Sequence, residues 1–148
     1  MINHREKAKE NFMAGYNCAQ SVFLAFCDET GLDKETAARL ASSFGGGMGR
    51  LREVCGAVSG MFMAAGMIKG YEDPKDQDGK KAQYQLVQDL AEAFKEKNDS
   101  IICRELLGLT QHSDSPVPSE RTAEYYQKRP CAELVADAAE ILERMLYD

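Results

Sequence analysis

The chain has 148 residues, of which 44% are hydrophobic and 28% are charged, and its formal net charge is −6. This length and composition are typical of one globular domain, so we expect a single domain over residues 1–148, neither disordered nor embedded in a membrane. The acidic excess argues against bulk binding to nucleic acid or to an anionic membrane, because both require a basic surface.

Helical periodicity dominates the chain, which predicts an all-α bundle of about six to seven helices. The first helix is expected over 4–13. Asn17 is a suitable N-cap for a second helix that ends near Asp28, and Asp33 is one for a third helix that ends at Gly45.

Glycines make up four of the five residues from Gly45 to Gly49, a composition that carries a large ordering cost. The backbone N–H groups of Gly46, Gly47 and Gly49 can cradle an anion. The interpretation we favour is a tight turn that lets helices pack closely. The three glycines are therefore candidate binding residues, with helix packing as the alternative.

The next helix is expected to begin near Arg52 and to include an uncharged run over 54–68. This run is shorter than the ~20 residues that cross a bilayer, so we expect a central buried helix rich in glycine and methionine. Gly56 and Gly60 lie one turn apart on one face, where a ligand or another backbone can approach. Both join the candidate cofactor-binding residues.

The second half of the chain continues the helical pattern after a polar connection over 71–79. A long helix with an apolar stripe follows, and then a short one over 101–108 that Asp99 or Ser100 can cap. Residues 110–119 are expected to form a loop, 120–127 a short helix, and the last helix begins at Pro130.

Five cysteines occur, and four of them fall near predicted helix starts, where backbone N–H groups stabilise a thiolate: Cys18, Cys55, Cys103 and Cys131. The fifth, Cys27, is expected to be an inert small hydrophobic residue. The charged N-terminus does not look like a secretory signal, so we expect a cytoplasmic protein whose cysteines are not permanent disulfides. Arg52, Arg104 and Arg129 lie near three of the cysteines, but their proximity alone assigns them no role.

The run from Phe44 to Arg50, followed by Cys55-Gly56-Ala57-Val58-Ser59-Gly60, resembles the C_GCAxxG_C_C family of proteins described as redox-active. That family is characterised by four cysteines and a CGAxxG signature. The resemblance implies that Cys18, Cys55, Cys103 and Cys131 are the four family cysteines and that Cys55 opens the signature. It implies no established substrate.

The leading hypothesis is reversible thiol–disulfide chemistry by the four cysteines as catalytic residues, which needs no cofactor and gives Cys55 the role of attacking thiolate. The alternative is that the same four thiolates bind zinc or an iron–sulfur cluster. A third possibility is a helical interaction module with incidental cysteines. We expect a thiol-reactive small molecule or a protein as the partner. The two histidines, His4 and His112, give a hydrolase little support.

Overall fold

Helices account for every regular element that the computed structural model describes, which is residues 3–109 and 114–147. The all-α prediction is therefore confirmed. The longer helices are α1 (His4–Met13), α2 (Cys18–Ala25), α4 (Lys34–Ala41), α6 (Gly56–Lys69), α7 (Gln77–Asn98) and α10 (Cys131–Tyr147). The shorter elements are α3 (Cys27–Thr30), η1 (Ser42–Phe44), α5 (Gly45–Met48), α8 (Cys103–Leu106) and α9 (Ala123–Lys128). His112 and the beginning of the predicted loop over 110–119 lie outside the described residues.

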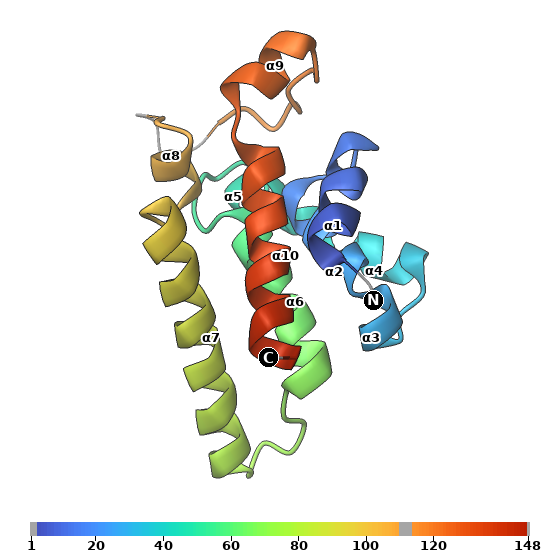
Figure 1. Ribbon diagram of the computed structural model, residues 1–148, viewed down its shortest axis with the longest axis vertical. Helices are drawn as coiled ribbons and strands as arrows, with labels where there is room; N and C mark the ends of the chain where they lie inside the picture. The colour runs from blue at the N-terminus through green and yellow to red at the C-terminus, as the bar shows by residue number, and fades with distance from the viewer. Residues whose placement is uncertain (1–2, 110–113, 148) are drawn as a thin grey trace.

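The centre of the molecule is shared by α6 and α10, which pack against each other (Figure 1). Helix α7 packs along one side of this pair, and α1 and α2 lie along the other. Their apolar faces form one core, whose largest fully buried side chains include Phe12, Phe23, Met61 and Phe94. The predicted glycine- and methionine-rich helix is thus central, although α10 contributes as much to the centre as α6.

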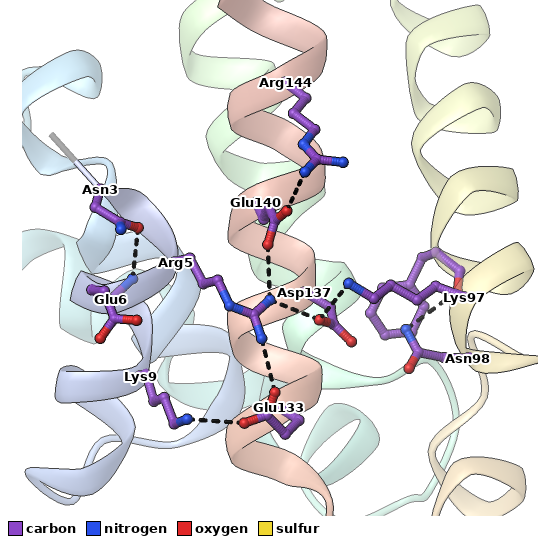
Figure 2. Close-up of polar contacts among 11 residues, drawn as sticks. Asn3, Arg5, Glu6, Lys9, Lys97, Asn98, Glu133, Asp137, Glu140 and Arg144 are labelled. Atoms are coloured by element: carbon purple, nitrogen blue, oxygen red, sulfur yellow. Dashed lines mark hydrogen bonds and ion pairs between the residues drawn. The ribbon is translucent and has the colours of Figure 1, made fainter. Parts of the chain in front are cut away.

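Ion pairs on one side of α10 connect it to both neighbouring layers (Figure 2). The Arg5 guanidinium on α1 donates to Glu133 at 2.8 Å and to Asp137 and Glu140 at 2.9 Å. The Lys97 ammonium on α7 lies 3.1 Å from the Asp137 carboxylate, whose side chain is only 8% exposed. Asp137 therefore has two cationic partners from opposite sides, which offsets the cost of burying its charge.

Several predicted helix boundaries are wrong because tertiary contacts override local propensity. The helix predicted from Arg52 begins at Gly56, and the one predicted over 101–108 covers only Cys103–Leu106. The residues in front of both helices pair instead in an isolated antiparallel bridge between Val54 and Ile102. A partner that is distant in the sequence therefore decides where these two helices begin.

Smaller differences occur at the other helix ends. The second predicted helix is interrupted at Phe26, and the one predicted over 120–127 occupies Ala123–Lys128. Asp99 ends α7 with a left-handed backbone, and the N-cap of α8 is Ile102, not the predicted Asp99 or Ser100. Within the described ranges no helix has both the length and the apolar character needed to cross a membrane.

Candidate functional site

Each of the four predicted cysteines stands at the beginning of a helix in the structure. Cys18, Cys103 and Cys131 are the first residues of α2, α8 and α10, and Cys55 is the N-cap of α6. Helices α6 and α10 begin at the same end of the molecule, where α5, α8 and α9 also lie (Figure 1). The fold thus gathers helix starts that are separated by more than 100 residues of sequence.

All four cysteines line one cavity of about 280 Å³ at this end of the bundle. Cys55, Cys103 and Cys131 are buried, Cys18 is half-buried, and all are free thiols. Cys27 does not line the cavity. The structure therefore brings together the four residues that the sequence singled out, while their catalytic role stays a prediction.

An antiparallel bridge holds two of these cysteines in place. The backbone N–H of Cys55 donates to the carbonyl oxygen of Ile101 at 2.8 Å, and that of Cys103 donates to the carbonyl oxygen of Glu53 at 2.6 Å. These bonds use backbone groups that a helix extended toward Arg52 would have occupied. The late start of both helices thus leaves the backbone of Cys55 and Cys103 free for this bridge, which brings the two residues close together.

The glycine-rich segment forms a left-handed turn along the cavity. Residues 46–50 all have φ between 64° and 70°, and Arg52 also has a positive φ of 58°. Position 47 also has no room for a side chain, because a Cβ on Gly47 would lie 2.6 Å from the Cβ of Cys103. Non-glycine residues in this conformation cost ~1–2 kcal/mol each, so Met48, Arg50 and Arg52 are held under strain.

The five candidate glycines divide into two groups. Gly46, Gly47, Gly49 and Gly56 line the cavity, whereas Gly60 is not among its lining residues. A Cβ on Gly60 would lie 2.6 Å from the carbonyl oxygen of Ala19 in α2. The absence of a side chain at Gly60 therefore serves the close packing of α6 on α2, and its assignment to ligand binding stays a prediction without support from the cavity.

Cys18 and Cys131 both line the cavity, and each thiol acts on the pKa of the other. The hydrogen bond from Cys18 is the main reason that the pKa of Cys131 falls to about 7, and the Arg129 charge and a hydrogen bond from the Tyr125 hydroxyl lower it further against desolvation. The same bond raises the pKa of Cys18 well above its usual value. Cys131 is thus the thiolate of the pair and Cys18 the proton donor.

The surroundings of Cys55 argue against its predicted role as the attacking thiolate. Burial raises the pKa of Cys55 to about 12, although the backbone N–H groups of Val58 and Ala57 act in the opposite direction. Burial also raises the pKa of Cys103, against a hydrogen bond at 3.5 Å from the Arg52 guanidinium to its Sγ atom. A position at a helix start does not by itself outweigh desolvation at these two sites.

Arginines supply the charged side chains of the cavity wall, and no Asp or Glu is among its described lining residues; the arginines are Arg50, Arg52, Arg121 and Arg129. Asp114 lies behind this wall, 3.0 Å from Arg52 and 3.3 Å from Arg50. The hydrogen bond from Arg52 is the main cause that lowers the pKa of Asp114. The predicted neighbour Arg104 instead faces Glu53 at 3.2 Å.

Sequence reasoning missed Tyr125, Arg50 and Arg121 as parts of the cavity. Tyr125 lies in a short helix, six residues before Cys131, and this spacing alone does not predict that the two side chains meet in the cavity. Burial, followed by the charges of Cys131 and Cys18, raises its pKa to about 12, so Tyr125 is a neutral hydroxyl donor at pH 7. Arg50 follows the glycine run directly, which is the one local clue to its position.

The metal-binding alternative finds no support in the geometry of the described residues. Within the ranges 3–109 and 114–147, no group of three or more His, Cys, Asp or Glu side chains is arranged to hold a metal ion. The four thiols line one cavity, but they are not grouped as the ligands of a single ion. The zinc and iron–sulfur interpretation therefore stays an untested prediction.

The chain was also compared with known proteins. A family model described as "Putative redox-active protein (C_GCAxxG_C_C)" matches residues 16–145. The match includes all four cavity cysteines and the glycine-rich turn. No curated protein and no solved structure matched the chain. Because the family model spans most of its length, the chain belongs to the C_GCAxxG_C_C family.

Proposed function

We propose that this protein carries out reversible thiol–disulfide exchange through Cys131 and Cys18. The observation that carries the proposal is that Cys18 and Cys131 line the same cavity and act on each other, so that one sulfur has a lowered pKa and the other a raised one. A thiolate is the nucleophile in this chemistry, and a thiol with a pKa near the ambient pH attacks best. Cys131 has this property, and Cys18, which lines the same cavity and acts directly on Cys131, is the residue that resolves the product.

The exchange proceeds in two displacements. The Cys131 thiolate attacks one sulfur of a substrate disulfide, forms a mixed disulfide and releases the first substrate thiolate. Cys18 then loses its proton and attacks the Sγ atom of Cys131, which releases the second substrate thiolate and leaves a Cys18–Cys131 disulfide. The substrate gains two electrons and the protein loses two, and a dithiol reductant returns the protein to its starting state.

The remaining two cysteines do not take the attacking role in this proposal. The raised pKa values of Cys55 and Cys103 keep them as neutral thiols at pH 7. A reducing cytoplasm, the location expected from the sequence, would keep the pair in the dithiol form between turnovers. This location is part of the proposal.

The test uses the full chain, reduced and then treated with hydroxyethyl disulfide, followed by peptide mapping. We expect a Cys18–Cys131 disulfide and the loss of two thiols per chain. Cys18→Ser should stop the reaction at a mixed disulfide on Cys131, and Cys131→Ser should remove most of the reactivity. Cys27→Ser is the matched control, because Cys27 lies outside the cavity, and it should react like the unsubstituted protein.

Two results would contradict the proposal. One is a mapped disulfide that does not include Cys131, or a Cys131→Ser variant that still reduces the probe at the normal rate. The other is stoichiometric zinc or iron in protein purified without oxygen, measured by elemental analysis, with thiols that no longer react with the probe. The second result would return the four cysteines to the metal-binding alternative.

A further inference from the structure

The charge of the cavity points to the class of disulfide that it takes. The protein as a whole carries a formal charge of −6, yet the described residues that line the cavity include four arginines and neither Asp nor Glu. We infer that the cavity selects small disulfides that carry a carboxylate close to the sulfur atoms, an inference that rests on the proposed function. A guanidinium pairs with a carboxylate in a planar, two-point contact.

Arg52 is the arginine whose contacts point most directly to a missing partner. Its side chain is only 3% exposed, its Nη2 atom lies 3.0 Å from Asp114, and its Nη1 atom donates to Cys103. Its Nε atom is buried and has no hydrogen-bond partner among the described residues. A buried donor without a partner is costly, and the Arg52 side chain is among those that line the cavity, so an anionic group there would lie next to its guanidinium.

Arg129 adds a second positive charge to the cavity wall. It lines the cavity two residues before Cys131, and its charge acts on the Cys131 thiolate. Its described side-chain contact is between the guanidinium and the ring of Tyr125, at 5.7 Å from the centroid, and not an ion pair with a carboxylate. Arg121, in contrast, donates to the carbonyl oxygens of Phe12 and Tyr16 and serves the fold.

The positions of Arg52 and Arg129 limit the distance between the anionic group and the disulfide. Both arginines contact or adjoin a cavity cysteine, so an anion that they bind lies a few bonds from the sulfur under attack. The cavity volume of about 280 Å³ is at the lower end for small-molecule sites. It holds a short dicarboxylate disulfide, or one arm of a longer one, and not a folded protein segment.

The experiment compares three small disulfides that differ chiefly in charge: 3,3′-dithiodipropionate (anionic), hydroxyethyl disulfide (neutral) and cystamine (cationic). The second-order rate constant of each with the reduced protein is measured at pH 7 and low ionic strength. Free dithiothreitol supplies the intrinsic order of the three probes. Relative to this order, we expect the protein to favour the anionic probe over the neutral one by at least about tenfold, and to disfavour the cationic one.

Variants identify the binding residues through the ratio of the anionic to the neutral rate constant, which is independent of how much Cys131 is ionised. Arg129→Gln and Arg52→Gln should each lower this ratio at least about threefold, and Arg129→Lys, which keeps the charge but not the two-point contact, should restore part of it. Arg104→Gln is the matched control, because Arg104 neighbours Cys103 without lining the cavity. If Arg52→Gln does not fold, as judged by circular dichroism, the comparison of Arg129→Gln with Arg129→Lys tests the inference.

The outcomes separate this inference from the proposed function. Equal relative rates for the three probes would overturn the carboxylate selectivity and leave the exchange chemistry in place. A ratio that Arg129→Gln and Arg129→Lys leave unchanged would also overturn it. If none of the probes reacts at Cys131, the proposed function is wrong and the inference fails with it.

Discussion

At Cys131 three neighbours act together on one sulfur atom: the Cys18 thiol, the Arg129 charge and the Tyr125 hydroxyl. Cys18 is distant in the sequence, whereas Arg129 and Tyr125 lie two and six residues before Cys131. Cys18 and Tyr125 each donate a hydrogen bond to the Cys131 sulfur. A hydrogen bond to a charged group is worth ~1.5–3 kcal/mol, which is more than the dipole of one helix start supplies at an exposed site. These donors outweigh desolvation at Cys131 and lower its pKa, whereas at Cys55, also at a helix start, burial outweighs the backbone N–H groups and raises it.

Removal of the Cys18 donor should therefore raise the pKa of Cys131. We expect Cys18→Ala to shift it upward by about one unit or more, since one unit corresponds to ~1.4 kcal/mol, and Tyr125→Phe to shift it by less. Cys18→Ser keeps a hydroxyl donor and should leave the pKa near that of the unsubstituted protein. The measurement is the iodoacetamide alkylation rate of Cys131 against pH, followed by mass spectrometry. A midpoint that stays near pH 7 in Cys18→Ala would show that the hydrogen bond is not its cause.

Between elements, the contact of α6 with α2 decides where Cys55 and Cys18 lie relative to each other. Small residues allow the close approach: a Cβ on Gly56 would lie 3.1 Å from the Cβ of Cys18, and one on Gly60 would lie 2.6 Å from the carbonyl oxygen of Ala19. The second contact is with backbone, which cannot move without shifting α2. Gly56 and Gly60 of the family signature thus allow α6 to pack closely on α2, and Gly56 also lines the cavity.

Helix α6 contains both a tight glycine and an open one, so the packing role can be tested within a single element. Gly60→Ala should lower the free energy of unfolding by about 1–3 kcal/mol, because the new methyl group overpacks the contact with α2. Gly66→Ala, where nothing lies within 4 Å of the added Cβ, should raise it by about 0.5–1 kcal/mol through helix propensity. Urea denaturation measures both. Equal effects of the two substitutions would contradict the close packing.

For the whole molecule, opposite charges are distributed unevenly. Acidic residues outnumber basic ones by 24 to 18, while arginines line the end of the molecule that holds the thiols. Several carboxylates are ionised more readily in the folded state than in the unfolded chain. The hydrogen bond from Arg52 lowers the pKa of Asp114, and the hydrogen bond from Lys9 lowers that of Glu133. Each such carboxylate links the stability of the fold to pH.

The sign of this linkage follows from the lowered pKa values. Above pH ~5 these carboxylates are ionised in both the folded and the unfolded chain, and their contribution to the free energy of unfolding is fully present. As the pH falls through ~3.9–4.3, the carboxyl pKa values of the unfolded chain, the unfolded chain binds protons first and the free energy of unfolding decreases. We expect the urea midpoint to fall between pH 5 and pH 3. Lys9→Gln should make this fall smaller, whereas Lys69→Gln, an exposed lysine in the last turn of α6, should not. A midpoint that is unchanged at pH 3 would contradict the linkage.

Local signals predicted the helix starts that a short-range contact decides. Asn17 caps α2 and forms a reciprocal pair of hydrogen bonds with Gln20, and Asp33 caps α4 by accepting from the Thr36 N–H. Such caps join residues three apart, so the sequence contains all of the information. The starts of α6 and α8 were placed wrongly, because a bridge between Val54 and Ile102 decides them.

The sequence by itself determined the helical class, the four cysteines at helix starts and the family, because helical periodicity, capping and motifs act over a few residues. Only the tertiary structure decided which sulfur is a thiolate. That choice depends on burial at Cys55 and on hydrogen bonding between Cys18 and Cys131, which are 113 positions apart in the chain. Desolvation and through-space contacts set a pKa, and neither can be read from neighbouring residues along the chain.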